Sequence, residues 1–177
     1  KMLAGGIYDH LGGGLSRYST DADWTVPHFE KMLYDNAQLL RLCNWALGET
    51  QDPLFRIRID ETAAWLLREM RNEDGAFASS FDADSDGQEG LFYTWTEEQI
   101  RSVLGDGTGE FFRYFQLVKP SNWEGDPVVR QTPAQQIESI DHQAEVSALR
   151  EKLYRARQKR VRPGRDDKVL VDWNGLA

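Results

Sequence analysis

Two histidines near the start of the chain, His10 and His28, stand among acidic residues. Asp9 directly precedes the first, and Glu30 follows the second by two positions. Imidazole transfers protons near neutral pH, and a histidine paired with a carboxylate can supply the base and acid that sugar 2-epimerisation needs on opposite faces of one carbon atom. These four residues are therefore predicted to be catalytic. In the alternative interpretation, each histidine donates to a backbone carbonyl and orders a loop.

Carboxylates in the same stretch would also suit hydrolysis of a glycosidic bond. Asp9, Glu30 and Asp35 can act as general acid and base if the surroundings keep one carboxyl group protonated. Nearby polar and aromatic side chains could bind hydroxyl groups or stack on a sugar ring. We expect substrate-binding roles for Arg17, Tyr18, Trp24, Lys31, Tyr34, Asp35, Asp82, Asp84 and Trp95. The alternatives are a structural salt bridge at Arg17, a solvated helix start at Lys31, and tryptophans in the core, where we place Trp45 and Trp65.

The loop DADSDGQEG contains three alternating aspartates that resemble the first half of a calcium-binding EF-hand loop. Asp82, Asp84 and Asp86 supply hard oxygen ligands, and Gly87 follows them. The twelfth position is Tyr93 instead of the required glutamate. Calcium is therefore a minor alternative, and we otherwise predict no metal and no organic cofactor.

A helical hairpin is predicted from Pro27 onwards, and its first helix carries His28. Glycines at 5–6 and 12–14 shape the turn that carries Asp9 and His10. Apolar residues at three- and four-residue steps predict a helix from Pro27 to Gly48, buried on most sides. Asp52 and Pro53 are typical of a helix start, so a second, antiparallel helix should run to Met70 with one face in water.

The remaining elements follow from local signals. A short polar break after the second helix precedes two apolar runs, a capping-box pattern, a proline- and glycine-rich stretch and one more amphipathic pattern. The sequence predicts strands at Ala76–Phe81 and Leu91–Trp95, a helix from Thr96 to Gly105, an amphipathic turn at Phe111–Phe115, a long loop at Lys119–Pro133, a helix from Asp141 to Arg162 and the start of another helix at Leu170–Ala177.

Charge is distributed unevenly along the 177 residues, whose net charge is −8. Nine lysines and arginines lie between Arg150 and Lys168 with three acidic residues, which leaves twelve basic and twenty-six acidic residues elsewhere. An acidic body disfavours nucleic acid, so the basic run is interpreted as a solvated helix face. A lone Cys43 favours a reducing, cytoplasmic location, and no apolar stretch indicates a membrane span or signal peptide.

Three ordered motifs carry a family resemblance. They are GGIYDHLGGGLSRYS with W-x-VPHFEKMLYDNAQL, then FDADSDGQEGLFYTW, then DDKVLVDWNGLA. Together they resemble the uncharacterised YyaL-type proteins, which include the spermatogenesis-associated thioredoxin-domain proteins. The motifs span Gly5 to Ala177, with no match from about Arg101 to Arg165.

The resemblance implies a mainly α fold, one part of an (α/α)6 toroid similar to N-acylglucosamine 2-epimerases and six-hairpin glycosidases, with short β-hairpin loops at the rim. Residues 1–177 would form a single partial barrel, without the family's thioredoxin-like domain and truncated at the C-terminal end. The Asp82 loop would then line the barrel mouth beside Asp9 and His10, with Glu89 adding a carboxylate. The expected activity is sugar epimerisation or hydrolysis; the alternative is a non-catalytic binding or scaffold domain. Open barrel edges would favour self-association.

Overall fold

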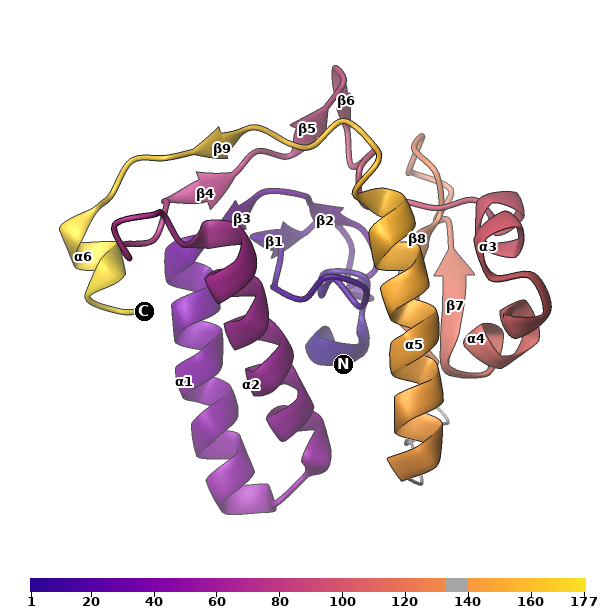
Figure 1. Cartoon of the computed structure of the whole chain (residues 1–177), viewed down its shortest axis with the longest axis horizontal. Coiled ribbons are helices and arrows are strands. Elements are labelled where there is room, and N and C mark those ends of the chain that lie inside the picture. The colour runs from indigo at the N-terminus through magenta and orange to yellow at the C-terminus, as the bar shows by residue number, and fades with distance from the viewer. Residues whose placement is uncertain (133–139) are drawn as a thin grey trace.

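The computed structural model describes residues 1–132 and 140–177. A helical hairpin forms one side of the molecule (Figure 1). Helices α1 (Leu33–Thr50) and α2 (Pro53–Trp65) run antiparallel, and the π-helical segment η2 (Leu66–Met70) continues α2. The Asp52 carboxylate accepts a hydrogen bond from the backbone N–H of Leu54, and Pro53 takes the first helical position. The predicted start of the second helix and the hairpin are therefore confirmed.

The first helix begins later than predicted, because short strands occupy the segment after Pro27. Strand β2 (Pro27–His28) pairs with β1 (Tyr18–Ser19). Strand β3 (Lys31–Met32) pairs with β4 (Ser80–Phe81), which in turn pairs with β9 (Arg165–Asp166). The prediction of a helix from Pro27 was wrong, since the strand that pairs with β3 lies about fifty residues further along the chain.

Helix α1 is also more exposed than its apolar pattern suggested. Leu42 is 57% exposed and Trp45 is 65% exposed, so burial on most sides and a core position for Trp45 were both wrong. α1 packs against α2 and, near its start, against α6 (Val171–Asn174). Its outer side faces away from the rest of the molecule (Figure 1). Trp65 on α2 is buried as predicted.

A second packing unit surrounds the long helix α5 (Ile140–Arg157). The predicted capping box is present: Thr96 and Gln99 exchange hydrogen bonds at the start of α3 (Glu97–Leu104). η3 (Gly105–Gly107) and α4 (Thr108–Tyr114) follow, and then strands β7 (Phe115–Val118) and β8 (Val128–Gln131) pair. The strand β8 replaces part of the predicted loop, whose last residue, Pro133, lies outside the described residues.

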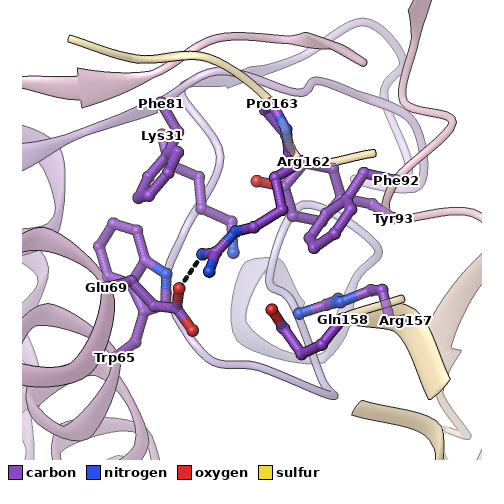
Figure 2. Close-up of a pocket in the computed structure, with 10 residues that line it drawn as sticks. All are labelled: Lys31, Trp65, Glu69, Phe81, Phe92, Tyr93, Arg157, Gln158, Arg162 and Pro163. Atoms are coloured by element: carbon purple, nitrogen blue, oxygen red, sulfur yellow. Dashed lines mark hydrogen bonds and ion pairs between the residues drawn. The ribbon is translucent and has the colours of Figure 1, made fainter. Parts of the chain in front are cut away.

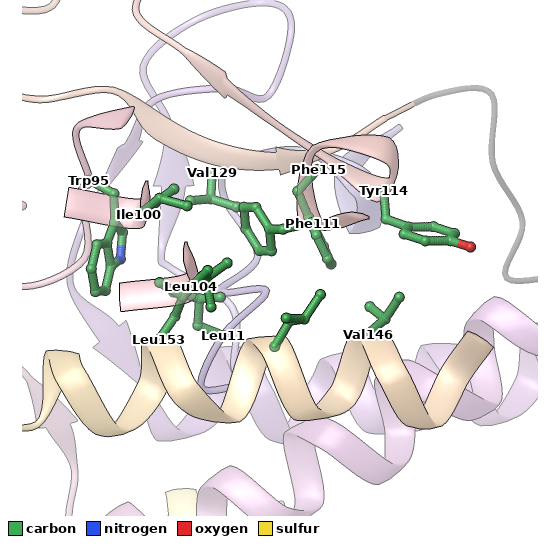
Figure 3. Packing of buried hydrophobic residues seen from close by; sticks show 11 residues of the cluster. Leu11, Trp95, Ile100, Leu104, Phe111, Tyr114, Phe115, Val129, Val146 and Leu153 are labelled. Carbon is green, nitrogen blue, oxygen red and sulfur yellow. The ribbon is translucent and has the colours of Figure 1, made fainter. Parts of the chain in front are cut away.

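The apolar stripe of α5 is confirmed. Its residues Val146, Leu149 and Leu153 are buried against aromatic and aliphatic side chains from α3, α4 and the β7–β8 hairpin (Figure 3). This core lies on the opposite side of α5 from the α1–α2 hairpin (Figure 1). The two packing units therefore meet along α5 and the N-terminal loops.

The aspartate-rich loop forms a hairpin of strands β5 (Asp84–Ser85) and β6 (Gln88–Glu89). Its two turn residues, Asp86 and Gly87, both have positive φ, 52° and 74°. Asp-Gly at this position is typical of a type I′ turn, which joins two antiparallel strands. The motif therefore serves the hairpin turn. Leu91–Trp95 forms a turn instead of the predicted strand, and of Ala76–Phe81 only the last two residues are a strand.

The fold is mixed α and β, instead of the mainly α fold that was expected. Helices are joined by small antiparallel sheets of two or three strands, and a 3-10 turn η1 (Met2–Ala4) opens the chain. Among the described helices, none combines the length and apolar character needed to cross a bilayer.

Candidate functional site

The segment His28–Lys31 points its side chains alternately to two sides. His28 and Glu30 are partly exposed, whereas Phe29 and Lys31 are 2% and 1% exposed. An extended backbone turns successive side chains to opposite faces. The candidate residues therefore separate into two groups, an outer cluster (Arg17, Tyr18, His28, Glu30 and Glu89) and an inner network (Asp9, Lys31 and Arg157).

In the outer cluster, His28 lies between two carboxylates. Its Nδ1 is 2.8 Å from Oε1 of Glu89, and its Nε2 is 3.2 Å from Oε2 of Glu30. A neutral imidazole carries one proton and can donate to only one of these oxygens, whereas a protonated ring donates to both. The ring can therefore take up or release a proton while it keeps a hydrogen-bond partner.

Three separate elements hold this cluster together. Pairing of β1 with β2 sets Tyr18 opposite His28, and the two rings stack at 5.0 Å. The Arg17 guanidinium donates to Glu30 at 3.1 Å. The β5–β6 hairpin supplies Glu89, which also accepts from the backbone N–H of Phe29 at 3.3 Å. An aromatic face and a cation thus border the histidine and its carboxylates.

Tyr34 and Asp35 lie in the first turn of α1. Burial raises the pKa of Asp35 to about 6, against the opposing effect of the Arg17 charge. One oxygen of this carboxyl, Oδ2, is buried without a partner in the described part of the chain. The Tyr34 ring packs edge-on against Trp173 at 4.7 Å. The Asp35 carboxyl group is therefore protonated more readily than that of an ordinary aspartate.

The inner network centres on the Asp9 carboxylate. It accepts from Lys31 Nζ at 2.8 Å and, through both oxygens, from Arg157 at 2.9 and 2.8 Å. The backbone N–H groups of Leu11 and Gly12 also donate to it. Burial alone would raise the pKa of Asp9, but the charges of Arg157 and Lys31 hold it well below its usual range. Asp9 is thus a fixed anion that anchors two buried cations.

Lys31 Nζ donates a second hydrogen bond, to the carbonyl of Gly13 at 2.8 Å, and lies over the rings of Trp65 and Tyr93. Burial lowers the pKa of Lys31 to about 8, although Asp9 opposes this shift. The carbonyl can approach because the turn has a positive φ of 82° at Gly13 and 85° at Gly14. A Cβ at Gly14 would lie 2.8 Å from the Trp65 ring, which explains the glycine there.

His10 lies apart from both groups. Its side chain is 2% exposed, and its Nε2 is 2.9 Å from the Gly5 carbonyl while Nδ1 is 3.4 Å from Nη2 of Arg58. Burial and the Arg58 charge hold the pKa of His10 well below its usual range, so the ring is neutral. Its geometry matches the alternative role, a histidine that donates to a backbone carbonyl and orders a loop.

The other predicted ligand-binding residues are scattered. Trp95 is 2% exposed, and the Arg160 guanidinium lies over its ring at 4.0 Å, so the structure places this tryptophan in the core instead of at a surface open to a sugar. Trp24 packs against the cluster around Leu3 and Ile7. Asp82 accepts from the N–H of Ala83, and Asp84 lies on β5.

Within the described residues, no three His, Cys, Asp or Glu side chains converge as metal ligands. Asp82, Asp84 and Asp86 therefore do not form a metal-binding group in this arrangement.

Sequence reasoning missed the arginines that enter the site from α5 and the segment after it. This basic run was interpreted as a solvated face, yet Arg157 is 3% exposed, and its neighbours donate to backbone carbonyls and carboxylates of residues between His10 and Thr94. Those contacts are Arg150 with His10 and Glu61, Arg157 with Asp9, Arg160 with Leu91, Phe92 and Thr94, and Arg162 with Glu69. Glu69 is also buried, but Arg56, Arg68 and Arg71 on the same predicted face are exposed, so the second helix has one side in water as predicted. The one feature of the sequence that could have indicated these contacts was the surplus of carboxylates outside the basic run, which need cationic partners.

Comparisons with known proteins support the resemblance that the motifs carry. The chain is 33% identical to human spermatogenesis-associated protein 20 over 99% of its own length, and 32% identical to the mouse protein of that name. An uncharacterised protein of Caenorhabditis elegans is 32% identical over the whole chain. The similarity is consistent with the YyaL-type family. The chain spans 27–29% of the length of these relatives, and no family model matches it.

Proposed function

We propose that this chain is part of a carbohydrate-handling domain, a sugar epimerase or a glycoside hydrolase, in which the outer cluster exchanges protons with the substrate. The observation that carries this proposal is the position of His28, partly exposed and held between Glu30 and Glu89. Histidine and carboxylates together supply proton donors and acceptors near neutral pH. Tyr18, half exposed beside them, offers an apolar ring face of the kind that sugars stack on.

In this mechanism, each member of the cluster has its own task. His28 accepts a substrate proton at Nε2 once the Glu30 carboxylate has turned away from this nitrogen and towards the substrate. The other ring nitrogen, Nδ1, keeps its proton and donates it in a hydrogen bond to the Glu89 carboxylate. Asp35, whose pKa of about 6 keeps it partly protonated near neutral pH, returns a proton. Arg17 binds a hydroxyl or carboxylate of the sugar. This assignment needs no organic cofactor.

The finer architecture belongs to the same proposal. An antiparallel helical hairpin such as α1–α2 is the kind of unit that an (α/α)6 toroid repeats, and the β5–β6 and β7–β8 hairpins lie between later helices of the chain (Figure 1). The resemblance to epimerases and six-hairpin glycosidases fits a chain that supplies the first part of such a barrel. Exposed Leu42 and Trp45 on α1 would then face further helices or a second copy of the chain.

A second candidate function is a non-catalytic binding or scaffold domain. It is favoured by one observation: the inner network occupies most of the interior between the α1–α2 hairpin and α5, and the cleft beside it has room for about a single water molecule. A catalytic domain needs a concave site with accessible acid and base groups, whereas a scaffold can fill its centre with side chains. In this case the domain would accompany the family's thioredoxin-like domain.

Calorimetric titration of the full chain distinguishes the two candidates. N-acylhexosamines, hexoses and uronic acids are titrated into the unaltered protein, His28→Ala and, as a matched surface control, Arg101→Ala, which loses only an exposed pair with Glu97. Saturable heat that disappears in His28→Ala alone supports a sugar site at the outer cluster. Uptake of solvent deuterium by the bound sugar would identify an epimerase, and release of a reducing end a hydrolase. No heat from any sugar refutes the carbohydrate proposal and favours the scaffold.

A further inference from the structure

A cleft lies on the buried side of the His28–Lys31 segment, lined by charged and aromatic side chains from five separate parts of the chain. Figure 2 shows its lining residues: Lys31, Trp65, Glu69, Phe81, Phe92, Tyr93, Arg157, Gln158, Arg162 and Pro163. The space between these side chains, with the open solvent at the mouth of the cleft included, is about 270 Å³. His28 and Glu30 are not among its lining residues, so this cleft is distinct from the outer cluster.

Positive charge exceeds negative charge around this cleft. The Asp9 carboxylate is shared by Lys31 and Arg157. The Glu69 carboxylate is shared by Arg162 and Arg68, and it also accepts from the Tyr154 hydroxyl. Four cations therefore face two carboxylates, in a protein whose net charge is −8. Two of these cations, Lys31 and Arg157, are buried and share the single charge of Asp9, whereas Arg68 and Arg162 are about half exposed. Buried cations are stable only when they are paired, so this local excess favours an additional anion.

Arg157 provides a second and independent observation. Its side chain is 3% exposed, and its Nε is buried without a hydrogen-bond partner among the described residues, although its two terminal nitrogens bind Asp9. A buried N–H without an acceptor is costly, and native structures place such groups where a ligand or water completes them. Arg157 lines the cleft directly (Figure 2).

We propose that this cleft binds a small organic anion, a carboxylate or a phosphate ester attached to a compact apolar body. The charged end lies between Arg157 and Arg162, where guanidinium groups give charge-assisted hydrogen bonds. The apolar body contacts the aromatic walls formed by Phe81, Phe92 and Tyr93. The site goes beyond the proposed function, since it uses different residues on the opposite side of the strand.

Arg162 controls entry to this site. It is about half exposed, lies at the mouth and is paired with Glu69 across the cleft (Figure 2). With the side chains in this arrangement, the interior has room for about a single water molecule. A ligand must therefore displace Arg162 from Glu69 and replace that carboxylate with its own anionic group. Glu69 acts as an internal competitor for the ligand.

The test is calorimetric titration of the full chain with phenyl phosphate, benzoate and the neutral analogue benzyl alcohol. We expect saturable binding of one or both anions and none of the alcohol, and the two anions separate a phosphate site from a carboxylate site. Arg162→Ala should weaken binding about tenfold or more, because a charge-assisted pair is lost. Glu69→Gln should strengthen binding, because the competing charge is removed. Arg101→Ala is the matched arginine control and should leave binding unchanged.

Two results would overturn the proposal. One is the absence of saturable anion binding in both the unaltered protein and Glu69→Gln; the other is equal affinity in Arg162→Ala. If Arg162→Ala loses its fold by circular dichroism, Arg162→Lys replaces it and should bind severalfold more weakly, since lysine lacks the bidentate guanidinium. His28→Ala should keep the anion affinity. If the sugar proposal fails, only the sugar titration is affected. If the anion proposal fails, only the anion titration is affected.

Discussion

The two sides of the segment His28–Lys31 make the same kinds of ion pair in different surroundings. On one side, His28 and Glu30 meet Glu89 and Arg17 where all four side chains contact water. On the other, Lys31 meets Asp9 in a place where both side chains are almost fully buried. Pairs exposed to water contribute little to stability, whereas breaking a buried pair leaves an uncompensated charge. Adjacent residues can therefore serve function on one face and stability on the other.

Of the variants that test the difference between the two faces, the one at Asp9 should have the largest effect on stability. Asp9→Asn keeps the shape of the side chain but leaves Lys31 and Arg157 without their anion, so we expect the free energy of unfolding to fall by about 3–5 kcal/mol. Urea denaturation followed by circular dichroism measures this. Because the pKa of Asp9 is depressed in the folded state, its contribution is complete above its ordinary pKa and is lost as the pH falls through the folded value. A loss below 1 kcal/mol would show that the inner network is not structural.

Lys31→Met should have a smaller effect, a loss of about 1–2 kcal/mol. Asp9 keeps the bidentate Arg157, so its charge stays compensated, and the main cost is the Gly13 carbonyl that loses its donor. The methionine also fills most of the volume between Trp65 and Tyr93. The same urea series compares the two variants directly, and a loss equal to that of Asp9→Asn would contradict the unequal roles assigned to them.

The pH dependence of Lys31 provides a separate check. Its folded pKa is about 8, below its ordinary value of 10.5. Between these values the unfolded chain binds more protons than the folded one, so this group makes the free energy of unfolding rise with pH across that window. Urea midpoints measured from pH 8 to 10 should therefore rise less steeply in Lys31→Met than in the unaltered protein. Parallel curves would mean that the burial of this amine has no energetic effect.

The hairpin that supplies Glu89 to the outer cluster should tolerate change better. Gly87→Ala places a Cβ at a φ of 74°, which costs about 1 kcal/mol although no atom blocks it. The matched change Gly48→Ala in the exposed part of α1 meets no neighbouring atom and should stabilise by about 0.5–1 kcal/mol. Thermal unfolding should show a lower melting temperature for Gly87→Ala and a higher one for Gly48→Ala. Two shifts of the same sign would contradict the positive-φ turn.

The smallest expected change in stability is at Glu30, on the outer face. Glu30→Gln removes an exposed pair with Arg17 and His28, so the free energy of unfolding should change by less than about 1 kcal/mol. If the proposed function holds, the same variant loses sugar binding. A large loss of stability here, similar to that of Asp9→Asn, would erase the distinction between the two faces.

Features fixed by neighbouring residues were predictable from the sequence. The Asp52–Pro53 helix start, the Thr96–Gln99 capping box and the buried stripe of α5 each depend on residues within a few positions of one another. The outer cluster was partly predictable for the same reason, since Arg17, Tyr18, His28 and Glu30 lie within one short stretch. The helix from Pro27 failed because Phe29 fits both a helical and an alternating pattern.

The inner network could not be predicted, because its members are distant in sequence. Nothing near Arg157 distinguishes it from Arg155, the exposed arginine two positions earlier in the same helix, and its buried carboxylate partner, Asp9, lies 148 positions earlier in the chain. The strand β3 likewise depends on β4 and β9, which come from later parts of the chain. Trp45 was expected in the core and is exposed, whereas Trp95 was expected at the surface and is buried. Burial depends on which elements pack nearby, and the local sequence pattern does not reveal this.

The span of 148 residues between Asp9 and Arg157 also affects how the protein folds. A ribosome that has made the N-terminal half exposes a carboxylate and a lysine whose arginine partner has not yet been synthesised. Contacts between distant residues form slowly, because a long loop must close before they become favourable. We therefore expect the docking of α5 against the N-terminal loops to be a late step of folding, before which Asp9 remains accessible to water.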